Sequence, residues 1–243
     1  MMLSTSLQAQ ILEHAKAESP SECCGLLAVV KGRLKYFECE NLAYDPEITF
    51  LLNPNDYMRI EDKGEIVGVV HSHPNSHPNP SEADKVACEE SGVPWHIVSP
   101  HLNSWGYCEP AGFVLPYVGR KFVFGVVDCY SMCRDWYKRE WDLNLTNYLR
   151  KDQWWDAGEN LYVDNFANEG FKEIPIRELE KGDTILMQIK SPVPNHAAIY
   201  LGNQQILQHL QGRLSSRDVY GGYYAINTVM ALRHENAESL RGA

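Results

Sequence analysis

No stretch of the 243-residue chain is apolar for long enough to cross a bilayer, and no segment gathers basic residues into a stripe. We therefore expect neither a membrane-spanning segment nor a nucleic-acid partner. Residues 1–14 lack the basic and continuous apolar segments of a secretory signal, which predicts a protein made and folded in a reducing cytoplasm. The seven cysteines are odd in number, which argues against a disulfide framework.

Acidic side chains outnumber basic ones, and the excess lies almost entirely in the first half of the chain. Residues 1–110 hold 16 acidic and 7 basic side chains, a net charge of −9, whereas residues 111–243 hold 16 and 15, a net charge of −1. An acidic half suits a site that gathers divalent metal, and it equally suits a soluble surface. The length favours two domains, and residues 110–118, which contain Pro and Gly, form the predicted boundary. We predict domains at 1–110 and 111–243.

The most informative stretch of the first half is residues 71–84, His-Ser-His-Pro-Asn-Ser-His-Pro-Asn-Pro-Ser-Glu-Ala-Asp. His71 and His73 are two residues apart, so both imidazoles point to the same face of an extended strand. The prolines that follow force a loop, and Ser81 then opens an apolar-periodic helix with Asp84 in its first turn. Two imidazole nitrogens and one carboxylate oxygen form an open set of three ligands, typical of a catalytic zinc site.

Each half of this pattern also has a simpler interpretation. The histidines could be ordinary residues of an edge strand. Ser81 and Asp84 match the S-x-x-D pattern of a helix-capping box, which needs no metal. His77 could compete as a ligand, although we favour a solvated position for it. The two halves together, at this spacing, favour the zinc interpretation.

The stretch resembles the JAMM (MPN+) metalloprotease signature, in which H-x-H-P is followed after six residues by S-x-x-D. Residues 20–27, Pro-Ser-Glu-Cys-Cys-Gly-Leu-Leu, look like the E-x-C-G-[LI]-[LI] opening of that family. The resemblance implies a zinc site formed by His71, His73 and Asp84. It also implies that Glu22 takes the proton of the water and that Ser81 helps to hold the oxyanion. These roles suit the residue types, because zinc lowers the pKa of its bound water to about 7.

The periodicity of the first half predicts a mixed α/β domain around this site. We expect helices over 6–17, from 53 to about 63 and from 81 to about 92. We expect strands over 22–30, 34–40, 65–71, 95–99 and 105–108.

The second half contains a cysteine at the predicted start of a helix. Asp128-Cys129-Tyr130-Ser131 follows the apolar residues 122–127, and free helical N–H groups would lower the pKa of the Cys129 thiol. His196 begins a predicted strand that turns at Gly202-Asn203 into residues 205–209. This hairpin could bring His196 and His209 together, one as base and one to orient it. Most free cysteines are buried apolar residues, however, and Cys133 and the aromatic stripe of the same helix are better explained by packing.

Three segments resemble the NlpC/P60 family of cell-wall cysteine peptidases: Asp128-Cys129, residues 181–186 (Lys-Gly-Asp-Thr-Ile-Leu) and residues 196–202 (His-Ala-Ala-Ile-Tyr-Leu-Gly). The resemblance implies Cys129 as nucleophile, His196 as base and His209 as the third polar residue. Tyr117 matches a tyrosine that the family often carries near the active site. The family cleaves peptide bonds in peptidoglycan stems, often next to diaminopimelate. Tyr130 departs from the usual D-C-S-[GS] pattern, and the segment before residues 181–186 is unusually long.

The order of the two domains resembles that of the tail assembly proteins of long-tailed phages, the family of the lambda tail protein K. The predicted fold class is α+β, with an N-terminal JAMM/MPN-like α/β domain and a C-terminal papain-like NlpC/P60 domain with an antiparallel sheet. The resemblance implies other tail-tip proteins and peptidoglycan as partners. It further implies assembly in the host cytoplasm and action from the virion tail tip on the periplasm and cell wall.

Two other interpretations remain. The first is a structural tail-tip component in which both sites are vestigial. The second is a host-encoded peptidase similar to deubiquitinases, against which the attached cysteine domain argues.

Overall fold

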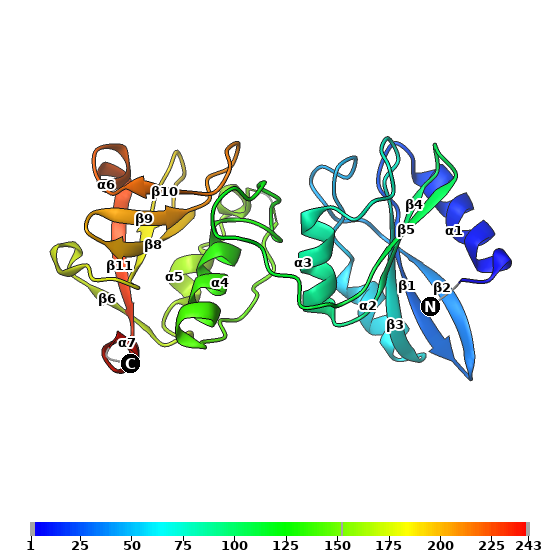
Figure 1. Ribbon diagram of the computed structural model, residues 1–243, viewed down its shortest axis with the longest axis horizontal. Helices are drawn as coiled ribbons and strands as arrows, with labels where there is room; N and C mark the ends of the chain where they lie inside the picture. The colour runs from blue at the N-terminus through cyan, green and yellow to red at the C-terminus, as the bar shows by residue number, and fades with distance from the viewer. Residues whose placement is uncertain (1–2, 152, 242–243) are drawn as a thin grey trace. The chain divides into compact units, whose positions relative to one another are not determined.

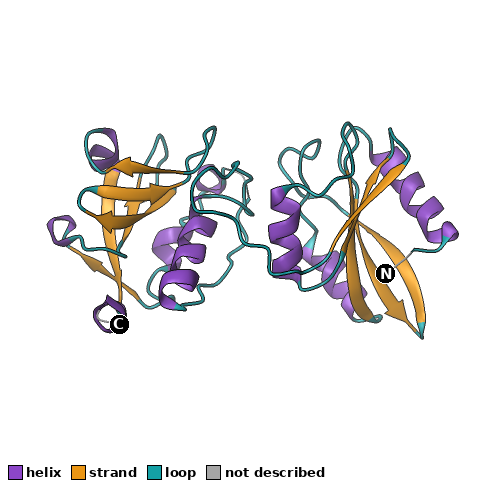
Figure 2. Ribbon diagram, in the orientation of Figure 1, coloured by secondary structure: helices purple, strands orange, loops and turns teal. Residues whose placement is uncertain are grey.

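A computed structural model of the chain describes residues 3–151 and 153–241 (Figure 1). The chain forms two compact units, Met1–Val114 and Leu115–Ala243. Each unit has its own sheet and its own helices (Figure 2). Among the described residues, no helix has both the length and the apolar character that a membrane span requires.

The first unit is built on a five-stranded sheet in the order β2-β1-β3-β4-β5. In chain order its elements are α1 (Thr5–Glu18), β1 (Cys24–Val30), β2 (Arg33–Cys39), α2 (Pro54–Glu61), β3 (Glu65–Ser72), α3 (Glu82–Ser91), β4 (Trp95–Ser99) and β5 (Ser104–Cys108). Strands β3 and β4 are parallel and joined through α3, and the other neighbouring pairs are antiparallel. The predicted helices and strands agree with these bounds to within two residues.

Helices cover both faces of this sheet, and α1 lies on the opposite face from α2 and α3 (Figure 1). Successive residues of a strand point to opposite faces. Leu27 therefore packs toward Ile11 of α1, whereas Leu26 packs toward Ile60 of α2. The same alternation directs His71 of β3 to the α3 side, where its ring stacks on Phe50 at a centroid distance of 4.8 Å.

The second unit is built on a six-stranded sheet in the order β10-β9-β8-β7-β11-β6, antiparallel throughout as predicted. In chain order its elements are α4 (Cys129–Trp141), η1 (Trp154–Ala157), α5 (Leu161–Asn165), β6 (Phe171–Ile174), η2 (Ile176–Glu178), β7 (Thr184–Met187), β8 (His196–Gly202), β9 (Gln205–Gln208), β10 (Ser216–Val219), α6 (Tyr223–Asn227), β11 (Thr228–His234) and α7 (Ala237–Arg241). The prediction of two domains of mixed α and β structure is confirmed.

Helix α4 packs on one face of this sheet and forms the larger core of the unit. Its Cys133, Trp136 and Tyr137 are buried against Ile199 and Leu207 of β8 and β9. The aromatic stripe of the helix and Cys133 are therefore core residues. This packing fixes the start of α4 relative to the start of β8, where the predicted nucleophile and base lie.

The Gly182-Asp183 pair before β7 is explained by close packing and by charge. A Cβ on Gly182 would lie 2.3 Å from the ring of Trp141, and the φ angle of this residue is +90°, so only glycine fits. Asp183 is fully buried and pairs with Arg233 at 2.8 Å and with Arg241 at 2.5 Å. The motif thus ties β7 to β11 and α7.

Replacing this buried carboxylate should destabilise the second unit. We expect Asp183→Asn to lower the free energy of unfolding by about 2–3 kcal/mol, because hydrogen bonds to a charged partner are lost from two arginines. Glu180→Gln is the matched control: Glu180 pairs with the same arginines but is exposed, so we expect a loss below about 1 kcal/mol. Urea unfolding of both variants measures the difference, and equal losses would contradict this account.

Candidate active sites

His71, His73 and Asp84 converge at one end of the first sheet. The Nε2 atoms of the two histidines are 3.1 Å apart. The Asp84 carboxylate places Oδ1 3.3 Å from His71 Nε2 and Oδ2 3.4 Å from His73 Nε2. The ligand atoms of all three residues lie within 4.8 Å of one another. The structure thus brings together the three residues predicted as metal ligands.

Local structure holds each of these side chains in place. The Asp84 carboxylate accepts a hydrogen bond from the Ser81 backbone N–H at 2.7 Å, and Ser81 Oγ accepts one from the Asp84 N–H at 3.1 Å. This is a capping box, so the simpler interpretation of S-x-x-D is confirmed. His73 Nδ1 lies 2.9 Å from the carbonyl oxygen of His77, so Nδ1 carries a proton and donates to that oxygen, while Nε2 faces the cluster. The His77 side chain is exposed.

The cluster has a donor set that suits zinc. Two imidazole nitrogens face each other at hydrogen-bonding distance and a carboxylate touches both, an arrangement that a divalent cation would satisfy. Burial alone would raise the pKa of Asp84, but hydrogen bonds from His71 and His73 hold it well below its usual range. The carboxylate is therefore ionised.

Glu22 lies two residues before the start of β1 and is buried close to His73 and Asp84. Burial raises the pKa of its carboxyl to about 8, with His73 opposing and Asp84 adding to the effect. A carboxyl with a raised pKa near a cation site is suited to accept and return a proton near neutral pH. Ser81 lies at the exposed start of α3, where its hydroxyl oxygen is the helix cap.

Cys129 is the first residue of α4, as predicted, and Asp128 is the cap of that helix. The Asp128 carboxylate is buried and accepts hydrogen bonds from Ser131 N at 2.8 Å, from Gly125 N at 2.9 Å and from Arg150 Nε at 2.8 Å. Arg150 is also buried, and its ion pair with Asp128 ties residues 147–150 to the start of the helix. The Asp128 carboxylate therefore fixes the start of α4, and with it the position of the Cys129 thiol.

The sulfur of Cys129 lies between a tyrosine and the start of β8. Its Sγ is 3.2 Å from the hydroxyl oxygen of Tyr162, and it is also within hydrogen-bonding reach of the Ala197 backbone. Burial and the Asp128 carboxylate raise the pKa of the Cys129 thiol, although Tyr162 and the Ala197 backbone oppose the rise. The sequence argument that the helix N-terminus lowers this pKa is thus outweighed, because the thiol is desolvated and lies next to an anion.

His196 is the first residue of β8, next to Ala197, and a chain of hydrogen bonds holds its ring. His196 Nε2 lies 2.9 Å from Oε1 of Gln208, whose Nε2 donates to Asp218 Oδ2 at 2.6 Å. Asp218 thus fixes the orientation of the Gln208 amide, and the amide oxygen requires a proton on His196 Nε2. Nδ1 is left as the basic nitrogen. Burial lowers the pKa of His196 to about 4, so the ring is neutral at pH 7.

The structure places Gln208, and not His209, against His196. At the turn, Gly202 pairs with Gln205. If this register continued along both strands, His209 would pair with Ala198 and lie on the same face of the sheet as His196. A bulge between Tyr200 and Gly202 shifts the pairing by one residue, so that Ala198 faces Gln208. His209 therefore points to the other face and packs edge-on against Phe122 at 5.0 Å. The backbone of Arg120 and that of Arg213 lie near its ring.

Tyr117 lies far from the thiol. Its hydroxyl donates to Glu140 at 3.1 Å and its ring contacts the guanidinium of Arg139 at 4.8 Å. Glu140 and Cys129 are at opposite ends of α4, about 16 Å apart along the helix axis at 1.5 Å per residue. The tyrosine beside the sulfur is instead Tyr162 of α5.

Sequence reasoning missed three residues of this site, Tyr162, Gln208 and Asp218. Gln208 could have been found only by predicting the bulge, because a one-residue shift decides which strand residue faces His196. Tyr162 lies in the long segment between α4 and β7, and no local pattern in the sequence links it to Cys129.

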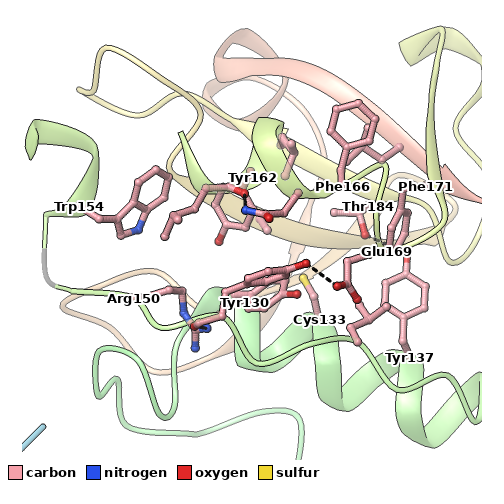
Figure 3. A pocket seen from close by; sticks show the side chains of 17 residues that line it. Tyr130, Cys133, Tyr137, Arg150, Trp154, Tyr162, Phe166, Glu169, Phe171 and Thr184 are labelled. Atoms are coloured by element: carbon pink, nitrogen blue, oxygen red, sulfur yellow. Dashed lines mark hydrogen bonds between the residues drawn. The ribbon is translucent and has the colours of Figure 1, made fainter. Parts of the chain in front are cut away.

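A small apolar pocket of about 50 Å³ lies beside Tyr162 (Figure 3). Tyr162 and Trp154 line one wall, and Tyr130, Cys133 and Tyr137 of α4 line the opposite one. The polar groups of the lining include Arg150 and Glu169. The pocket is lined both by the segment that carries α5 and by the helix that carries Cys129.

Two family models match this chain, one in each unit. Residues 4–108 match the prokaryotic homologs of the JAB domain. Residues 119–233 match the NlpC/P60 family.

Two relatives align with most of the chain and a third with part of it. The chain is 38% identical to the tail tip assembly protein K of Escherichia phage N15 over 230 residues, which cover 93% of each chain. It is 37% identical to the tail tip assembly protein K of Escherichia phage lambda over 183 residues, 75% of this chain and 89% of that protein. A desampylase of Haloferax volcanii is 30% identical over 112 residues, 41% of this chain and 81% of that protein. The chain therefore belongs to the family of the phage tail tip assembly protein K, with a JAB domain followed by an NlpC/P60 domain.

Proposed function

We propose that this chain is a peptidase of the phage tail tip that cuts stem peptides of peptidoglycan with its second domain. The main supporting observation is the position of Cys129 at the start of α4, within reach of the backbone of Ala197. Ala197 follows His196, whose ring is oriented by Gln208 and Asp218. The NlpC/P60 match and the names of the two phage relatives support the reaction and its place. The chain would be assembled with other tail-tip proteins in the host cytoplasm. It would act on the cell wall of the next host.

The proposed reaction begins with a neutral thiol and a neutral imidazole. His196 Nδ1 takes the proton of Cys129, and the thiolate attacks the amide carbonyl carbon, so that a C–S bond forms. The protonated imidazole then gives its proton to the leaving amine as the C–N bond breaks. Water, deprotonated by the same nitrogen, cleaves the thioester and restores the thiol. Gln208 keeps the ring in the required tautomer throughout.

We further propose that the first domain is a zinc-dependent (iso)peptidase. His71, His73 and Asp84 would hold the ion, which supplies an acidified water when bound. Glu22 would take the proton of that water, and the Ser81 hydroxyl would donate to the carbonyl oxygen of the substrate. The desampylase relative supports a hydrolytic role for this domain.

Removing the nucleophile tests the second domain. We expect Cys129→Ala to abolish clearing of purified peptidoglycan in a zymogram, because no other group can form the thioester. Cys133→Ala, one helical turn away in the core, is the control and should retain activity. Clearing by Cys129→Ala at the wild-type rate would overturn the assignment. A wild-type protein that clears no cell wall would favour the structural interpretation of this domain.

A second pair of variants tests which residue orients His196. We expect Gln208→Leu to lower the rate of stem-peptide cleavage at least about tenfold, because the imidazole loses the acceptor that sets its tautomer. We expect His209→Gln to leave the rate within about twofold, since His209 packs on Phe122 and points away from His196. Circular dichroism of both variants checks their folding. The opposite order of effects would restore His209 as the third residue.

Metal analysis tests the first domain. We expect about one equivalent of zinc per chain after dialysis against trace metal, and loss of that zinc in the double variant His71→Ala, His73→Ala, because a single carboxylate remains. His77→Ala should keep the zinc, since only the backbone carbonyl of His77 contacts the cluster. Stoichiometric zinc in the double variant would contradict the proposed site.

A further inference from the structure

Tyr162 is the side chain whose hydroxyl touches the predicted nucleophile. Its hydroxyl oxygen lies 3.2 Å from Cys129 Sγ, a distance at which a hydrogen bond to sulfur forms. The residue belongs to α5, within the long segment between α4 and β7, and not to the helix or strand that carries Cys129 or His196. This long segment therefore reaches the reacting atom.

We propose that Tyr162 is a catalytic residue of the second domain, whose hydroxyl donates a hydrogen bond to the Cys129 sulfur and stabilises it as the thiolate. This role rests on the function proposed above. The donor acts twice: when the thiolate forms before attack on the amide, and when the C–S bond of the thioester breaks and the sulfur leaves as thiolate. No proton moves from Tyr162 in either step. The thiol proton goes to His196 Nδ1 and then to the leaving amine.

The electrostatics of the site create the need for such a donor. The thiol is desolvated and lies next to the Asp128 carboxylate, so the negative sulfur is disfavoured. His196 is a weak base in its buried position and is neutral at pH 7, so the resting site holds no positive imidazolium that would favour the thiolate. A hydrogen bond to the charged sulfur offsets part of this cost, because charge-assisted hydrogen bonds are stronger than neutral ones.

Tyr162 is well suited to remain a donor. Burial and the neighbouring thiol hold the pKa of its phenol well above the usual range, so the hydroxyl keeps its proton at every working pH. Its ring is held edge-on by Trp154 at 5.8 Å and by Tyr130 at 6.0 Å. The Arg150–Asp128 ion pair fastens the beginning of the same segment to the start of α4. The hydroxyl is therefore directed at the sulfur by contacts that do not depend on substrate.

The test is the pH dependence of Cys129 alkylation in the full chain, with Tyr162→Phe compared with the wild type. Iodoacetamide is the probe. Fragment-ion mass spectrometry, which assigns the label to Cys129 or to Cys133 within one peptide, separates this thiol from the other six. We expect the midpoint of alkylation to rise by about one pH unit in Tyr162→Phe, because the thiolate loses a donor. Stem-peptide cleavage at pH 7 should fall about tenfold, and the deficit should shrink as the pH rises.

Tyr130→Phe is the matched control. Its ring contacts that of Tyr162, but its hydroxyl donates to the Thr146 carbonyl oxygen at 2.9 Å, so its alkylation profile should match the wild type. An unchanged profile in Tyr162→Phe would overturn the proposal. Faster alkylation of Tyr162→Phe at every pH would also overturn it, since the role of Tyr162 would then be to shield the thiol from the reagent. A shifted midpoint in a protein that cleaves no peptidoglycan would support the contact with sulfur and overturn the proposed function instead.

Discussion

In both domains a buried aspartate in the first turn or at the cap of a helix determines where the site forms. The free N–H groups at a helix N-terminus stabilise a carboxylate that would otherwise be costly to bury. In α3 the capping carboxylate is itself the predicted metal ligand, since Asp84 contacts both His71 and His73. In α4 the cap is Asp128, and the residue after it is Cys129, the proposed nucleophile. Each helix packs on its sheet, so the cap holds the reactive group near the start or end of a strand.

The buried carboxylates of Asp84 and Asp128 have opposite consequences in their two sites. Beside the histidine pair, the charge of Asp84 favours binding of a cation. Beside Cys129, the charge of Asp128 disfavours the thiolate and raises the pKa of the thiol. The second site therefore needs donors around the sulfur, and Tyr162 and the Ala197 backbone are placed to act as such. A cap that fixes the nucleophile thus also makes it harder to ionise, and the long segment that carries α5 supplies the compensating contact.

Much of this architecture was predictable from local sequence. Short-range patterns determine short-range structure, so the strand that carries His71, the capping box of Ser81 and Asp84, and the start of α4 at Cys129 were all correctly predicted. The convergence of His71, His73 and Asp84 was also predictable, because these residues lie within fourteen positions of one another on adjoining elements. The domain order was sufficient to indicate the family.

What the sequence alone determined, then, is the identity of the elements and of the residues at their ends. Tertiary structure decided which distant side chains meet. A single bulge in the β8–β9 hairpin brings Gln208 to His196 and turns His209 away, because a one-residue shift in register moves every side chain to the other face. Tyr162 reaches Cys129, and Tyr117 does not, because the packing of a long irregular segment, and not spacing along the chain, sets that contact.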